Sequence, residues 1–273
     1  MFTLNHNDHQ HILVMPNFIE NPDALKRFAI AHGFGGIDWS IDPDRLPATP
    51  SEESAWAGMQ KTFAPLEIRY HCPFSRVDIG HEDKDIREKS MALFKRIIRL
   101  VSKAGGKYLT IHVGLGHDTT KILSWESTIK NLRDLVHFGN EHGIAICLEN
   151  LAWGWTSKPN LFEKLVRRSG VAVTVDIGHA DACESIQCQQ FSVKDFISPH
   201  PAKVLNAHIY HTEIAGVGHI PPKSYNDISG RLELLGRSAC TWWVIELREE
   251  KSLLATKPFV AQFLSSDAMS VFA

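Results

Sequence analysis

Short apolar runs alternate along the chain with longer segments in which apolar residues recur at helical spacing. The short runs suit strands buried on both faces, and the longer segments suit amphipathic helices that cover such strands. The pattern predicts strands at residues 11–16, 36–41, 67–74, 107–114, 144–150, 171–175, 204–211 and 241–248. It predicts helices over 21–31, from 51 onward, and over 83–104, 124–142, 159–169, 225–235 and 252–264. Residues 216–222 and the segment around Cys183 and Cys188 are predicted to be irregular.

The order of these elements predicts a single (β/α)8 TIM barrel over residues 1–273. Eight strand–helix units give about 34 residues per unit, which matches a closed barrel with its active site at the C-terminal face of the strands. The alternative is a doubly wound open sheet, which would normally carry a glycine-rich phosphate turn after its first strand. Pro16, Asn17 and Phe18 follow the first predicted strand instead, so the barrel is favoured.

One stretch, residues 171–180, combines a strand pattern with candidate chemistry. Its apolar, β-branched run VAVTV is followed by Asp176 and His179. Polar residues at the end of a buried parallel strand are typical of an active site in an α/β protein. Taken alone, the stretch leaves two interpretations open. The two residues are either functional, or they are an aspartate that caps a turn and a histidine on the surface.

The composition is that of a globular protein, with 44% hydrophobic and 22% charged residues and a formal net charge of −2. This balance does not attract a nucleic acid, so a small-molecule substrate is expected. No apolar stretch is long enough to cross a membrane, and no signal sequence begins at Met1. The five cysteines are an odd number without disulfide-scaffold spacing, which favours reduced thiols and a cytoplasmic location.

Six consecutive predicted strands end in a side chain that can bind a metal ion. These side chains belong to His71, His112, Glu149, Asp176, His208 and Glu246. Because the C-terminal ends of parallel barrel strands lie at one face, we expect them to converge there. Glu149 and Glu246 each end an apolar run, where an unpaired carboxylate is costly to bury. Oxygen-rich ligation suits a divalent ion, with Mn²⁺ or Zn²⁺ expected first and Mg²⁺ or Co²⁺ as alternatives.

Five segments carry a family resemblance. They are CLEN at 147–150, VDIGHA at 175–180, NAHIYHTE at 206–213, GHIPP at 218–222 and VIEL at 244–247. In this order and spacing they resemble the xylose isomerase-like TIM barrels, over about the third to the eighth strand. That superfamily includes sugar and sugar-phosphate isomerases and epimerases, inosose dehydratases and zinc-dependent apurinic endonucleases.

The resemblance implies roles for particular residues. It implies a divalent metal ion held by Glu149, Asp176, His208 and Glu246. In the isomerases and epimerases, the glutamates that match Glu149 and Glu246 move the substrate proton, so these two are the implied catalytic residues. Substrate contacts are implied for His179 and His211.

Two further residues are candidates from their positions alone. Arg248 lies just past the last candidate ligand, where it can bind an anion, although an exposed arginine explains it as well. Trp153 lies in the loop after the fifth strand, where it can stack on a sugar or a ring, although loop packing explains it nearly as well.

The endonuclease branch of the resemblance implies additional ions. His71 and His112 match histidines that hold an additional zinc there, and His179 and His219 match ligands of a third zinc. That third site also needs an acid two residues before the last histidine, where this chain has Val217. The full three-zinc set is therefore expected to be incomplete.

Two classes of enzyme follow from these patterns. The first expectation is a metal-dependent isomerase or epimerase of a small polyhydroxy carbonyl compound, working through an enediolate. Ketose epimerases usually carry an arginine after the strand-seven histidine, where this chain has Ile214 and Ala215. The alternative is a metal-dependent hydrolase or lyase of a small amide or phosphodiester, and a third interpretation is a barrel that binds without turnover. Since dimers and tetramers are common in such families, a homo-oligomer is also expected.

Overall fold

A computed structural model of the chain describes residues 11–265, which fold into the closed barrel that the sequence predicts. Parallel strands pair in the order β1-β10-β7-β6-β5-β4-β3-β2, and the last strand closes onto the first. The barrel strands are β1 (Ile12–Pro16), β2 (Gly36–Ser40), β3 (Glu67–Cys72), β4 (Tyr108–Ile111), β5 (Ala145–Glu149), β6 (Ala172–Asp176), β7 (Val204–Ile209) and β10 (Trp242–Ile245). This closure excludes the doubly wound open sheet.

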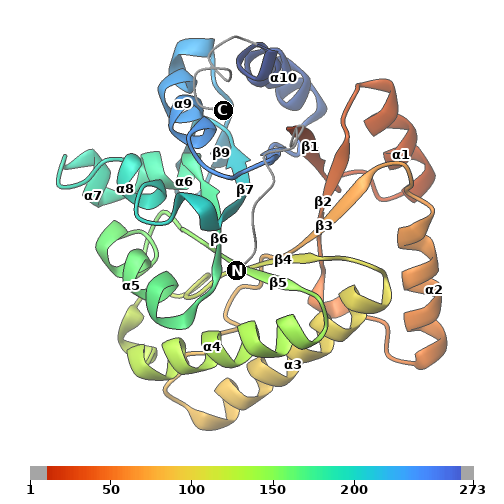
Figure 1. Ribbon diagram of the computed structural model, residues 1–273, viewed down its shortest axis with the longest axis vertical. Coiled ribbons are helices and arrows are strands. Elements are labelled where there is room, and N and C mark those ends of the chain that lie inside the picture. Colours follow the sequence, from red (N-terminus) through yellow and green to blue (C-terminus); the bar gives the residue numbers. More distant parts are fainter. Residues whose placement is uncertain (1–10, 266–273) are drawn as a thin grey trace, which may run out of the picture.

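Helices connect the strands and surround the barrel (Figure 1). The longer ones are α1 (Pro22–Ala31), α2 (Pro50–Lys61), α3 (Lys84–Lys103), α4 (Trp125–Glu141), α5 (Pro159–Ser169), α9 (Ser229–Gly236) and α10 (Glu250–Ser265). No helix within residues 11–265 has the length and apolarity needed to span a bilayer.

Helix α3 shows how the sequence sets these elements. The Asp83 carboxylate caps its first turn by accepting hydrogen bonds from two backbone N–H groups. Phe94, Ile97 and Ile98 lie on its buried face, at the spacing of one helical stripe. Gly105 follows the helix with φ +84°, a conformation that glycine adopts without strain. The cap therefore sets the start of α3, the apolar stripe sets its buried face, and the glycine sets its end.

Two segments differ from the sequence prediction. Residues 216–222, predicted to be a loop, contain β9 (Gly218–Ile220), which pairs antiparallel with β8 (Thr212–Ile214). The irregular segment after β6 contains three short helices, α6 (Ile177–Ala182), α7 (Glu184–Gln187) and α8 (Lys194–Ile197). Both predictions were wrong because these elements are three to six residues long. Such lengths are too short for a hydrophobic period to reveal.

Strand register brings the C-terminal ends of the barrel strands to one level. Asp176 at the end of β6 pairs with His208 of β7. His208 in turn pairs with Val244 of β10, two residues before Glu246. Because paired residues on neighbouring strands lie about 5 Å apart, these side chains start close enough to share a ligand.

Candidate metal centre

Every barrel strand from β3 to β7, together with β10, contributes one side chain to a buried cluster at the C-terminal end. The six predicted residues His71, His112, Glu149, Asp176, His208 and Glu246 are all there, each at most 7% exposed. The predicted convergence is therefore present, and the side chains separate into groups with distinct donor atoms.

The first ligand group consists of His71, His112 and Glu149. The two histidine Nε2 atoms lie 3.0 Å apart. Glu149 Oε2 lies 3.4 Å from His71 Nε2 and 3.0 Å from His112 Nε2. Ligand atoms around a tetrahedral zinc ion are about 3.3 Å apart, given Zn–N distances of about 2.0–2.1 Å. The three donor atoms therefore have the spacing of one coordination sphere.

The second ligand group consists of Glu149, Asp176, His208 and Glu246, whose donor atoms lie within 4.8 Å of one another. His208 Nδ1 lies 3.2 Å from Glu149 Oε1, 3.0 Å from Glu246 Oε2 and 4.0 Å from Asp176 Oδ2. Three carboxylates and one imidazole match the donor set that the resemblance implies.

Glu149 belongs to both groups through different atoms. Its Oε2 faces the first ligand group, and its Oε1 faces His208 in the second. A carboxylate with one oxygen in each coordination sphere is able to bridge two ions. The side chain of Glu149 is 1% exposed, so no solvent competes for either oxygen.

The third ligand group consists of His179, Glu213 and His219. His179 Nε2 lies 3.2 Å from Glu213 Oε2. Glu213 and His219 are paired across the β8–β9 hairpin. His219 Nδ1 contacts the Glu246 backbone carbonyl at 2.9 Å, which leaves its Nε2 to act as a ligand.

The β8–β9 hairpin therefore brings an acid, Glu213, beside His219, whereas the sequence analysis looks for this acid at position 217. An acid was expected two residues before His219, where Val217 is 72% exposed. Glu213 takes that place from the neighbouring strand, because the hairpin folds residue 213 back against residue 219. The only sequence signal was a glutamate before a glycine-containing turn, and it is readable only once the hairpin is known.

Asp38 of β2 is a buried acid in the cluster that sequence reasoning missed. Its Oδ2 lies 3.3 Å from His71 Nδ1 and 3.9 Å from His208 Nε2. A carboxylate beside the second nitrogen of a ligand histidine fixes the ring and its tautomer. Asp38 lies in the middle of β2, whereas Glu149 ends β5, so only the register of the strand shows that its side chain faces the cluster.

Many polar atoms of the cluster are buried and have no hydrogen-bond partner among residues 11–265. They are His71 Nδ1, His112 Nδ1, both oxygens of Glu149, Asp176 Oδ2, both ring nitrogens of His208 and Glu246 Oε2. Glu149 Oε1 and Glu246 Oε2 both approach His208 Nδ1, at 3.2 and 3.0 Å, so several of these atoms converge on one region. A cation at the point of convergence would satisfy several of these atoms together, so the residues fit a metal ion.

Electrostatics within the cluster also favours a cation. Burial raises the pKa of Asp176 to about 6. Burial would raise the pKa of Glu149 as well, but His208 and His112 hold it well below its usual range. Burial would lower the pKa of His208, yet Glu149 and Glu246 raise it well above its ordinary value. Protonated imidazole thus supplies positive charge that a bound cation would supply instead, freeing the ring to act as a ligand.

Asp176 caps a turn, and it is also placed where it could bind a metal ion. Its Oδ1 accepts a hydrogen bond from the His179 backbone N–H at 2.7 Å and caps α6, while its Oδ2 faces the second ligand group. The surface interpretation of His179 was wrong, since that residue is 7% exposed.

The predicted substrate contacts lie around the cluster. The backbone carbonyl of His211 accepts a hydrogen bond from Arg231 Nη1, and its ring Nδ1 lies 3.1 Å from Arg231 Nη2. Arg248 is exposed and donates to Ser40 Oγ at 3.0 Å. Trp153 is partly buried beside the loop that follows β4. These residues remain predicted substrate contacts.

Comparison with known proteins assigns the chain to a family. The sequence profile of the xylose isomerase-like TIM barrel family matches residues 27–251. An uncharacterized protein of Methanocaldococcus jannaschii is 29% identical over 197 residues, which cover 72% of this chain and 80% of the relative.

Solved structures share the same architecture. A D-tagatose 3-epimerase-like protein superposes with a TM-score of 0.69 at 15% identity, covering 93% of this chain and 97% of that structure. Endonuclease IV from Thermus thermophilus superposes with a TM-score of 0.62 at 16% identity, covering 93% and 98%. At these identities the likeness establishes a shared barrel fold.

Proposed function

Because the chain belongs to the xylose isomerase-like TIM barrel family, we propose that it is a metal-dependent hydrolase using two or three divalent ions. The observation that carries this proposal is Glu149, whose two oxygens face two different ligand groups. A mononuclear sugar epimerase needs the second ligand group alone. The buried first group and the half-buried third group would then have no function in the epimerase.

The ions we propose are Zn²⁺ in the histidine-rich first and third groups, and Zn²⁺ or Mn²⁺ in the oxygen-rich second group. When bound, they would act as Lewis acids on the reacting oxygens of the substrate. The chain supplies the orientation. Asp38 holds the ring of His71, and Asn150 donates to the Asp176 carbonyl at 2.8 Å, which ties β5 to β6.

The substrate we propose is a small phosphodiester or amide. A net charge of −2 argues against a nucleic acid. Glu213 is 30% exposed and His219 is half-buried, while His112, His179 and Glu246 retain slight exposure, so a substrate would approach from this side. Glu246 would be ionised there, because His208 holds its pKa below the usual range against the effect of burial. It can then accept a proton as well as act as a ligand.

We place the protein in the cytoplasm, in keeping with five free thiols.

An isomerase or epimerase of a small sugar is the second candidate. It is favoured by Glu149 and Glu246, which approach the same His208 nitrogen from two strands and are suited to move a substrate proton. The fold shared with a D-tagatose 3-epimerase-like protein is consistent with it.

Metal content and turnover separate the two candidates. Protein purified without a His tag would be analysed for zinc and manganese, then tested with bis(4-nitrophenyl) phosphate, an anilide and a set of ketoses. Two or more ions with ester or amide cleavage would support the hydrolase. One ion with ketose interconversion would replace it with the epimerase. Glu246→Gln should abolish turnover, while Glu88→Gln, an exposed carboxylate on α3, should retain it.

A further inference from the structure

A pocket lies at the opposite end of the barrel from the candidate metal cluster. It has a volume of about 680 Å³ and is lined by the N-terminal parts of β3 and β4, the C-terminal end of α2 and the loop before β4. That volume lies within the range of about 300–1,000 Å³ typical of small-molecule sites. The proposed function leaves this pocket unused.

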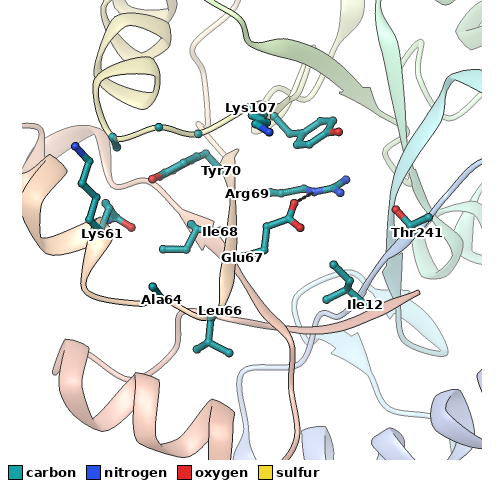
Figure 2. A pocket seen from close by; sticks show the side chains of 15 residues that line it. Ile12, Lys61, Ala64, Leu66, Glu67, Ile68, Arg69, Tyr70, Lys107 and Thr241 are labelled. Carbon is teal, nitrogen blue, oxygen red and sulfur yellow. Dashed lines mark hydrogen bonds and ion pairs between the residues drawn. The ribbon is translucent and has the colours of Figure 1, made fainter. Parts of the chain in front are cut away.

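The pocket is basic. Lys61, Arg69 and Lys107 line it, and Glu67 is the one acid among its lining residues. Figure 2 shows Arg69 projecting toward Thr241 on one side of β3, and the next residue, Tyr70, projecting toward Lys61 on the other. The net positive charge favours an anionic ligand.

Arg69 is fixed in place before any ligand arrives. It is 5% exposed, and its guanidinium lies over the rings of Tyr108 and Trp242, at 3.8 and 4.5 Å from their centroids. Its Nη1 donates to Asn206 Oδ1 at 2.6 Å, and its Nε to Glu67 Oε1 at 3.0 Å. Its Nη2 makes no hydrogen bond to any residue between 11 and 265. A charged donor held rigid and left with free N–H groups costs little entropy to engage.

Gln60 is the second, independent sign of a ligand. It lines the same pocket and is 3% exposed, yet neither Nε2 nor Oε1 of its side chain has a hydrogen-bond partner among the described residues. A buried amide without partners costs about 1–3 kcal/mol. A ligand with both donor and acceptor groups would satisfy it.

We propose that this pocket binds a phosphorylated small molecule of about the size of a nucleoside monophosphate. The phosphate would be recognised by Arg69, with Lys61 and Lys107 adding to the positive charge of the pocket, and a polar group of the organic part by Gln60. The site is independent of the proposed function, because the metal ligands lie at the C-terminal ends of the same strands.

Binding to the full-length chain tests this proposal, with AMP as the probe and adenosine as its uncharged counterpart. Metal is first removed by chelation and the chelator dialysed away, so that the metal cluster cannot hold the phosphate. AMP at a hundredfold excess over its Kd should raise Tm by about 3 °C or more, whereas adenosine should not. Equal shifts from the two probes, or none from AMP, would overturn the proposal.

Variants locate the site. Lys61→Gln combined with Lys107→Gln should weaken AMP binding at least about tenfold in calorimetry, because two of the three basic side chains are lost. Lys164→Gln, an exposed lysine on α5, serves as the matched control and should bind as the wild type does. Unchanged affinity in the double variant would refute the assignment.

Gln60→Leu gives a readout that a merely structural role would not produce. It should raise Tm in the absence of AMP, since it removes the unpaired amide. It should also weaken AMP binding. A fall in Tm together with unchanged binding would show that Gln60 serves the fold alone.

Discussion

Replacing Glu149 with glutamine tests the reasoning behind the metal centre most directly. Glutamine has nearly the same size, so Glu149→Gln opens no cavity. It removes the negative charge and replaces one oxygen with an NH₂ group, which cannot coordinate a cation. Four histidine nitrogens lie 3.0–3.5 Å from the two carboxylate oxygens in the wild type. One substitution should therefore disturb both ligand groups that share this residue.

The contacts of Glu149 set the expected loss of metal affinity and of stability in Glu149→Gln. Loss of a hydrogen-bond partner that only supports a ligand weakens metal binding about 10- to 100-fold. Loss of a shared ligand should reach at least about 100-fold for each of two ions, or about 2.7 kcal/mol per ion. Without metal, breaking a buried charge pair costs about 3–5 kcal/mol. His208 limits this cost if it releases its proton.

Titration calorimetry with Zn²⁺, together with metal analysis after dialysis, measures these effects. His112→Ala should weaken one ion, Glu246→Gln the other, and Glu149→Gln both, while Glu88→Gln should match the wild type. If Glu149→Gln weakened a single ion and left the other within about threefold, Glu149 would not bridge two ions. The hydrolase proposal would then lose its main support.

Three further outcomes are expected. Chelation should lower Tm by about 10 °C, and Zn²⁺ should restore it, because the cation satisfies buried polar atoms. An unchanged Tm in a thermal scan would argue against a bound ion. Glu213→Gln should remove one ion and spare the others in metal analysis, whereas an unchanged count would exclude the third ligand group. At pH 8 a thiol reagent should react rapidly with the exposed Cys188 alone. Burial raises the pKa of Cys147, Cys183 and Cys240 to about 12, and it raises the pKa of Cys72 well above its ordinary value. A Cys188→Ser variant that still reacted rapidly would contradict this.

The barrel and the convergence of six strand-end candidate ligands were predictable because each rests on a local pattern. An apolar run of five residues predicts a strand buried on both faces, and a carboxylate at its end indicates a functional site. Residues from different strands then converge by topology alone. Glu149, Asp176 and Glu246 were found in this way.

The missed residues depend on contacts that no local pattern encodes. Glu213 became a candidate ligand only through a hairpin of three-residue strands. Asp38 lies mid-strand, and whether such a side chain faces the barrel interior depends on register, which the sequence does not specify. The basic pocket needs α2, β3 and the loop before β4 together. Gln60 looks like an ordinary helix residue until its burial is known.

A layer of three hydrogen-bonded side chains, from Thr110, Thr174 and Asn206, separates the two polar ends of the barrel interior. Thr110 and Thr174 share a hydrogen bond of 2.8 Å, and Asn206 donates to both hydroxyls, at 3.3 and 3.2 Å. Below this layer, Asn206 accepts from Arg69; above it lie the metal ligands, with His71 two residues beyond Arg69 on β3. None of these three side chains is ionisable. Their hydroxyls and the Asn206 NH₂ group bond to one another, and the Asn206 oxygen accepts from Arg69. The layer can therefore insulate the proposed cation site from the proposed anion site, although strand β3 runs through both.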